Sequence, residues 1–142
     1  YEPIIEIHMA GMDGPKEDDL GRRGLELIGT NCIHAGVVRA KNTKRCLIGE
    51  ISLDEVMTVS LGKEKVEQVT LSELKVGDML GPVATISWLL NKLKSEGNKE
   101  EALLRDGTFV ICSTPGALHL VPPGREVRVE FSGLETSCTA AT

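Results

Sequence analysis

Apolar and charged side chains alternate along residues 126–131, and this period of two predicts a strand with one buried face. The residues expected on the inner face are Val127, Val129 and Phe131. Residues 56–71 contain two strand-like arms around a turn at 61–64, which predicts a β-hairpin. Four shorter apolar runs also predict strands: 3–9, 33–40, 108–112 and 118–121.

The segment after Gly81 gives the clearest helical pattern. Pro82 suits the first turn of a helix, where its missing N–H costs nothing. Apolar side chains then recur at spacings of three and four, which predicts one buried face made of Val83, Ile86, Leu89, Leu90 and Leu93. Gly97 is expected to end this helix in the left-handed conformation. With a shorter helix over 20–28, the order of elements favours an α+β fold.

The composition is that of one globular domain covering residues 1–142. Apolar residues make up 41% of the chain and charged residues 26%, so the chain has enough apolar surface to form a core. The net charge of -5 disfavours nucleic acids and anionic membranes as partners, because both attract clusters of Lys and Arg. No run of about 18 apolar residues is present, so we predict no membrane span.

Two groups of side chains leave alternatives open. The four cysteines form no CxxC motif, which disfavours zinc and thioredoxin chemistry, and we favour four reduced thiols over two disulfide bridges. Basic residues gather at Arg39, Lys41, Lys44 and Arg45. This basic cluster is interpreted either as a solvated loop or as a patch that binds a phosphate group or a partner.

Several segments, in order and at the right spacing, resemble the C-terminal half of the fumarylacetoacetate hydrolase superfamily. Residues 3–7 are similar to its P-A-L-E-I strand, and residues 31–38 to its D-N-A-x-x-A-G-V-V stretch. Pro82 and residues 88–93 have the spacing of its H-P-x-x-x-x-x-W-L-A-N-K-L helix. The resemblance is greatest to the branch of 2-hydroxypentadienoate hydratases and 4-oxalocrotonate decarboxylases. It implies a mixed, rolled β-sheet with flanking helices, truncated here at the N-terminus.

The resemblance also implies a divalent ion, Mg²⁺ or Mn²⁺, held by three carboxylates. Glu6 matches the third of these ligands, whereas the strand that carries the other two lies upstream of the segment that this chain contains. One carboxylate binds a hard cation only weakly, because such ions require several oxygen ligands. We therefore expect no cofactor in this chain by itself, and Mg²⁺ or Mn²⁺ only if the site is completed from elsewhere.

Three further residues are candidates for the site, each beside a simpler interpretation. Glu6 and His8 lie two apart on a predicted strand, so they share a face and are either two metal ligands or polar groups at a sheet rim. Asn31 matches a family position near the substrate, but asparagine beside Gly29 is also ordinary turn chemistry. His34 is either a substrate-binding residue or general base, or a loop histidine. No residue is assigned as catalytic.

Two functions from different classes follow. The first is a degenerate, non-catalytic domain that serves as a structural or interaction subunit of a larger assembly. The second is a metal-dependent lyase of small 2-oxo or 2-hydroxydienoate acids, completed by a partner chain or by upstream residues. Sheet edges left open by the truncation are expected to pair with other subunits or with a second copy. The expected location is intracellular, in the cytosol or an organelle matrix such as that of mitochondria.

Overall fold

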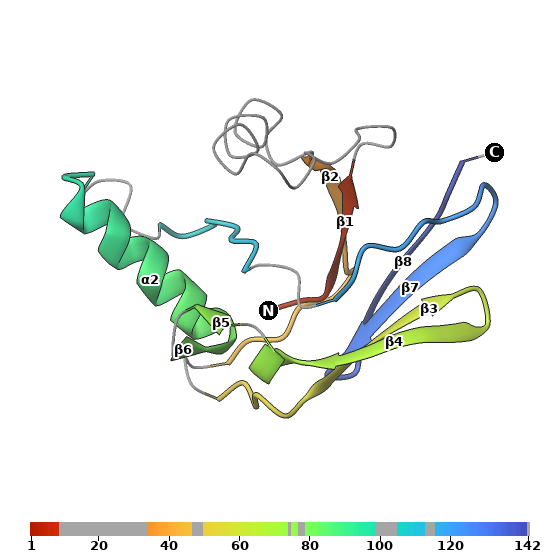
Figure 1. Cartoon of the computed structure of the whole chain (residues 1–142), viewed down its shortest axis with the longest axis horizontal. Helices are drawn as coiled ribbons and strands as arrows, with labels where there is room; N and C mark the ends of the chain where they lie inside the picture. The colour runs from red at the N-terminus through yellow and green to blue at the C-terminus, as the bar shows by residue number, and fades with distance from the viewer. Residues whose placement is uncertain are drawn as a thin grey trace, which may run out of the picture.

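The computed structural model of the chain describes residues 1–8, 34–46, 50–73, 75–76, 79–98, 105–112 and 116–141, and in these ranges the fold is α+β. Figure 1 shows one long helix on one side of the molecule and the longer strands on the other. The elements are β1 (Ile4–His8), β2 (His34–Arg39), β3 (Val56–Leu61), β4 (Glu64–Thr70), the 3₁₀ turn η2 (Leu71–Glu73), β5 (Lys75–Val76), β6 (Met79–Leu80), α2 (Gly81–Ser95), β7 (Glu126–Phe131) and β8 (Leu134–Thr139).

The described strands form one four-stranded sheet, in the order β4-β3-β7-β8, and two ribbons, β1-β2 and β5-β6. All of their pairs are antiparallel. The mixed pairing that the resemblance implied is therefore not found in the part of the chain that the structure describes. The β1-β2 ribbon lies against β8, where the Thr136 hydroxyl donates to the Val38 carbonyl at 3.4 Å.

The predicted hairpin over residues 56–71 is confirmed as β3 and β4, which turn at Gly62 with a φ of 61°. The alternation along β7 is also confirmed. Its three inward side chains are buried, and Val129 stands opposite Val59 of β3 while Phe131 stands opposite Met57. A core forms where Phe131 and Leu71 pack together with Tyr1, Ile51, Leu53 and Met57. The ring of Tyr1 meets that of Phe131 edge to face, at a centroid distance of 5.8 Å.

Strand β8 was not predicted. It pairs with β7 through a two-residue turn in which Ser132 and Gly133 both have positive φ, 54° and 70°, as a type I′ turn requires. Lys44 holds this turn by donating from Nζ to the carbonyl and hydroxyl oxygens of Ser132. The inner face of β8 contains Leu134 and Thr136, so its pattern is less apolar than that of β7.

Helix α2 is confirmed. Gly81 begins the helix and Gly97 follows its end, and each position requires glycine for a different reason. At Gly81, φ is 79° and a Cβ would lie 2.4 Å from Cδ2 of Leu53, so only glycine fits without displacing that side chain. At the other end Gly97 has a φ of 86°, with hydrogen bonds from its N–H to Lys94 and from the Asn98 N–H to Leu93. These two bonds are those of a Schellman motif.

Two predicted strands were wrong, because residues 108–112 and 118–121 have no regular secondary structure in the described ranges. The first run lines a cavity, and the second places two leucines at the surface, so neither apolar run signals a place in a sheet. Leu89 of α2, expected to face inward, is exposed. The helix predicted over 20–28 lies outside the described residues.

Candidate functional site

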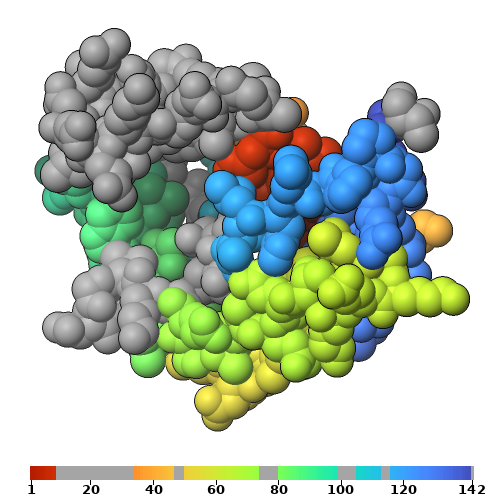
Figure 2. Space-filling view, turned by 45° about the vertical axis from the view of Figure 1, so that its right-hand side comes forward, coloured from red at the N-terminus to blue at the C-terminus, as the bar shows by residue number. Residues whose placement is uncertain are grey.

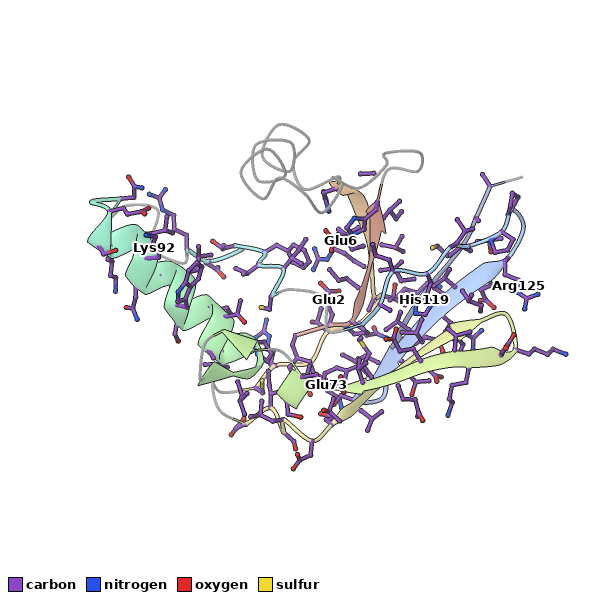
Figure 3. All side chains as sticks on the ribbon, viewed as in Figure 1. Glu2, Glu6, Glu73, Lys92, His119 and Arg125 are labelled. Carbon is purple, nitrogen blue, oxygen red and sulfur yellow. The ribbon has the colours of Figure 1, made fainter. Side chains whose placement is uncertain are left out.

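The candidate site begins on one face of β1, where alternate residues point the same way. Figure 3 shows Glu2 and Glu6 on the side of β1 that faces helix α2. Glu6 accepts a hydrogen bond from His34 Nδ1 of β2 at 2.8 Å, and its other oxygen lies 3.6 Å from His8 Nε2. The expectation that Glu6 and His8 share a face therefore agrees with the structure. An ionised carboxylate only accepts, so Nδ1 is the ring nitrogen of His34 that carries the proton in this bond.

A β-bulge brings His34 to Glu6. The register runs regularly from Ile4 opposite Arg39 to Ile7 opposite Gly36, and then shifts so that His34, not Ala35, stands opposite His8. A shift of one residue exchanges the two faces of a strand. The single extra residue in β2 thus places the imidazole of His34 on the same face as Glu6.

A second acid–base pair repeats this geometry further along the ribbon. Arg39 stands opposite Ile4 and binds Glu2, two residues earlier, just as His34 stands opposite His8 and binds Glu6. Arg39 donates from Nε to Glu2 Oε1 at 2.7 Å and also contacts it through Nη2. The side chain of Glu2 is only 6% exposed and that of Arg39 is 55% exposed. Both contacts go to Oε1, so the pair offsets part of the desolvation cost of the Glu2 carboxylate, while Oε2 is buried with no hydrogen-bond partner in the described ranges.

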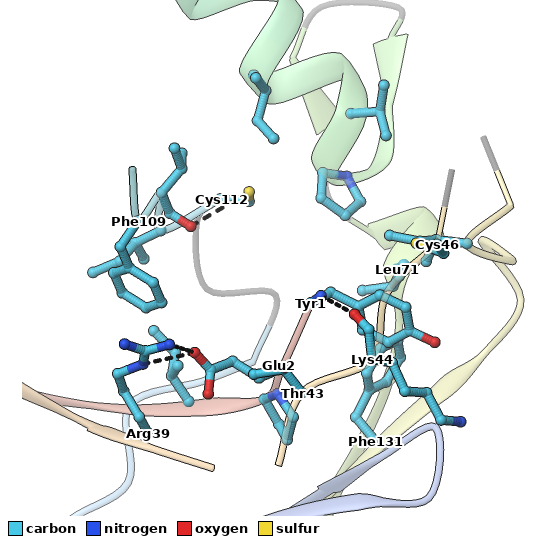
Figure 4. A pocket seen from close by; sticks show the side chains of 18 of the residues that line it. Tyr1, Glu2, Arg39, Thr43, Lys44, Cys46, Leu71, Phe109, Cys112 and Phe131 are labelled. Carbon is cyan, nitrogen blue, oxygen red and sulfur yellow. Dashed lines mark hydrogen bonds and ion pairs between the residues drawn. The ribbon is translucent and has the colours of Figure 1, made fainter. Parts of the chain in front are cut away.

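These strands form one wall of a cavity of about 560 Å³ (Figure 4). Helix α2 contributes Pro82, Val83 and Ile86, and the segment at 108–112 contributes a further wall. The guanidinium of Arg39 lies 4.6 Å from the ring centroid of Phe109, which joins this segment to the ribbon. A mostly apolar cavity of this size with a few charged groups is typical of a small-molecule site.

The described residues around Glu6 do not fit the Mg²⁺ or Mn²⁺ site that the resemblance implied. Both ions favour shells of oxygen ligands, whereas the neighbours of the Glu6 carboxylate include two imidazoles. In the described ranges, no group of three or more His, Cys, Asp or Glu side chains is arranged to hold a metal ion. The carboxylate of Glu6 instead acts as a hydrogen-bond acceptor between β1 and β2.

Of the other predicted site residues, the structure describes His34 but not Asn31. His34 binds Glu6 but is not one of the described residues that line the cavity. Asn31 lies outside the described residues. Cys46, Cys112 and Cys138 are free thiols, and burial raises the pKa of Cys112 and Cys138 above its ordinary value. Cys46 and Cys112 both line the cavity.

One cluster was missed by sequence reasoning. Glu67 of β4 bonds His119 Nε2 at 2.7 Å and accepts from the Ala117 N–H at 2.9 Å, so it holds residues 117–119 to the sheet. The hydrogen bond from His119 is the main cause that lowers the pKa of Glu67 below 4.5, and burial opposes it. Glu67 and His119 lie 52 positions apart in the sequence, and no motif links them.

Comparison with known proteins gives no relative: no family model, no curated protein and no solved structure matches the chain. Within the described ranges, no helix combines the length and the apolar character that crossing a bilayer requires.

Proposed function

We propose that this chain is a degenerate, non-catalytic relative of the fumarylacetoacetate hydrolase superfamily and acts as a structural or interaction subunit of a larger assembly. The rolled sheet of that superfamily is part of the proposal. Its support is the ordered set of similar segments, from residues 3–7 through the helix after Gly81 to the closing strands.

The observation that carries the proposed interaction role is a pair of exposed leucines on a fastened segment. Leu118 is 73% exposed and Leu120 is 91% exposed, while His119 between them points inward to Glu67. Figure 2 shows side chains of the blue, C-terminal part of the chain at the surface between β1 in red and the yellow-green β3-β4 hairpin. One exposed leucine is ordinary, but two on the outer face of an anchored segment suit a contact surface.

A second copy of the chain is the partner that this segment fits best. Residues 116–124 contain no Asp, Glu, Lys or Arg, so two copies running antiparallel meet no like charges along them. Such a twofold arrangement sets Leu118 of one copy opposite Leu120 of the other on the same face. Pro122 and Pro123 lack N–H groups and limit the pairing to the residues before them.

The arrangement of Glu6 supports the non-catalytic half of the proposal. Its carboxylate is engaged by His34 at 2.8 Å and by His8 at 3.6 Å, and these contacts fasten β1 to β2. A residue that serves the stability of a ribbon in this way needs no metal to account for its presence.

Sedimentation velocity tests the proposal with three matched chains. Because the contact is small, we expect the unaltered chain to dimerise with a Kd of about 10–100 µM, with Leu120→Asp shifting it to monomer. Leu89→Asp, the same change at an exposed leucine of α2, should leave the dimer intact. A chain that stays monomeric at millimolar concentration, or a dimer unchanged by Leu120→Asp, would contradict this contact.

One observation favours the alternative of a metal-dependent lyase completed by another polypeptide: Glu6 lines the cavity. In that case carboxylates from a partner would add the oxygen ligands that a hard cation requires. Turnover of a 2-hydroxydienoate acid that depends on Mn²⁺, on the co-purifying chains and on Glu6 would replace the non-catalytic proposal. Absence of this turnover from the complete assembly would exclude the metal-dependent lyase.

A further inference from the structure

The cavity has an apolar interior and a basic mouth. Leu71 and Phe131 form its buried floor, and Val83 and Ile86 of α2 form one wall. Residues 43–46 line the cavity and are exposed, so they lie at its opening, and they include Lys44 and Arg45 of the basic cluster formed by Arg39, Lys41, Lys44 and Arg45. The basic cluster, whose role the sequence left open, thus lies at the entrance to an apolar space.

Most of the charges on the cavity lining already have partners. Glu2 and Arg39 bind each other, Glu6 is bound by His34, and Lys44 donates to Ser132. Arg45, in contrast, has no ion pair or hydrogen bond within the described ranges. Lys44 donates only to uncharged oxygens, so within the described ranges both cations of this part of the lining, Lys44 and Arg45, are without a carboxylate partner, although the whole chain carries a net charge of -5.

Arg45 and Glu6 lie at different ends of the cavity. The Lys44 N–H donates to the Tyr1 carbonyl at 2.9 Å, which places Arg45 beside the start of the chain segment that leads into β1. Glu6 is five residues further along, roughly 16 Å at about 3.3 Å per residue of extended chain. A negative group at Arg45 is thus well separated from the Glu6 carboxylate.

We infer that the cavity binds a small anionic amphiphile, with its apolar tail between α2 and the floor and its negatively charged head group at Arg45. The tail removes apolar wall from water, and the head group gains a cation without crossing the apolar interior. A cationic head group would be repelled at the same place. This inference does not depend on the proposed subunit role, because it uses different residues.

Calorimetry with monomeric decyl phosphate tests the site. We expect saturable binding of one molecule per chain, and binding at least about tenfold weaker for butyl phosphate, decanol and decyltrimethylammonium, each of which lacks one of the two features. Arg45→Gln should weaken decyl phosphate about fivefold and leave decanol unchanged. Lys63→Gln, at the remote β3-β4 turn, is the matched control and should change nothing.

Three results would overturn the inference: equal affinity for decyltrimethylammonium, no effect of Arg45→Gln, or binding only to vesicles that contain anionic lipid and not to monomeric decyl phosphate. Val83→Asp gives a second test at the wall of the cavity, since it should weaken all tailed compounds while circular dichroism reports an intact fold. None of these outcomes bears on the dimer contact proposed at Leu118 and Leu120, which sedimentation tests separately.

Discussion

The four-stranded sheet and the β1-β2 ribbon are built by different means. In the sheet, buried valines and Phe131 face one another across strands, and glycine-containing turns join the hairpins. In the ribbon, the Glu2–Arg39 ion pair and the Glu6–His34 hydrogen bond cross the strands diagonally. Stability in the first region comes mainly from apolar burial and in the second from charge compensation.

This difference indicates which region of the molecule offers charged groups to a ligand. The sheet contributes Met57 and Phe131 to the floor of the cavity, while its buried valines pack against one another. The ribbon exposes a charged and apolar face to the cavity, and α2 closes the opposite side. Loss of apolar contacts should therefore weaken the sheet, and loss of the carboxylates should weaken the ribbon.

Phe131→Ala should give the largest loss of stability, because it empties the centre of the core. Its side chain is 7% exposed and packs on Leu71 and Tyr1, and comparable changes cost about 3–5 kcal/mol. Urea unfolding followed by circular dichroism measures the loss. Lys63→Ala, in the exposed β3-β4 turn, is the control, with an expected change of less than about 0.5 kcal/mol.

Gly81→Ala should cost about 2–3 kcal/mol, since it combines a left-handed backbone with a Cβ that collides with Leu53. Gly97→Ala has a similar φ but meets no atom within 4 Å, so about 1 kcal/mol is expected. The difference between the two variants in thermal unfolding isolates the collision. Equal losses would mean that the wall formed by α2 does not depend on a close fit at Leu53.

Glu2→Gln and Glu6→Gln test the ribbon, and each should destabilise the chain by about 1 kcal/mol through loss of a charge-assisted hydrogen bond. Raising the salt concentration should lower the stability of the unaltered chain more than that of Glu2→Gln, because salt screens the Glu2–Arg39 ion pair. Glu130→Gln, at an exposed position of β7, serves as the control. A loss that does not respond to salt would argue against charge compensation.

The smallest effect concerns Glu67 and pH. The hydrogen bond from His119 lowers the pKa of Glu67 in the folded chain, so the stabilisation is present above 4.5 and is lost as the pH falls through the folded value. Glu67→Gln should therefore cost about 0.5 kcal/mol at pH 7, and this cost should shrink below pH 4.5. Urea unfolding of both chains at several pH values measures this cost. A cost of Glu67→Gln that grows as the pH falls would contradict a lowered pKa of Glu67 in the folded chain.

The elements that the sequence predicted well are those with strong local signals. Strand β7 alternates apolar and charged residues, and α2 has a proline near its start and a glycine after its end. Strand β8 was missed because its inner positions after Leu134 hold Thr136 and Cys138, so no run of large apolar side chains marks it. Residues 108–112 and 118–121 were predicted as strands because an apolar run does not reveal whether it meets a sheet, a cavity or solvent.

The candidate site was less predictable, since its geometry depends on register and on long-range contacts. That Glu6 and His8 share a face follows from the period of a strand, but the place of His34 depends on a bulge with no sequence signal. The bonds that Glu67 makes with His119 and the Ala117 N–H join residues about fifty positions apart. No spacing rule brings such residues together.

Titration of the histidine side chains followed by nitrogen-15 NMR, with and without Mg²⁺, tests most directly whether Glu6 serves the ribbon and not a metal. If Glu6 serves the ribbon, the His34 signal should be unchanged by Mg²⁺ up to about 1 mM, because no hard cation competes for the carboxylate that His34 binds. Glu6→Gln should shift that signal without any metal. A saturable shift of the His34 and His8 signals at micromolar Mg²⁺, abolished by Glu6→Gln, would contradict the account.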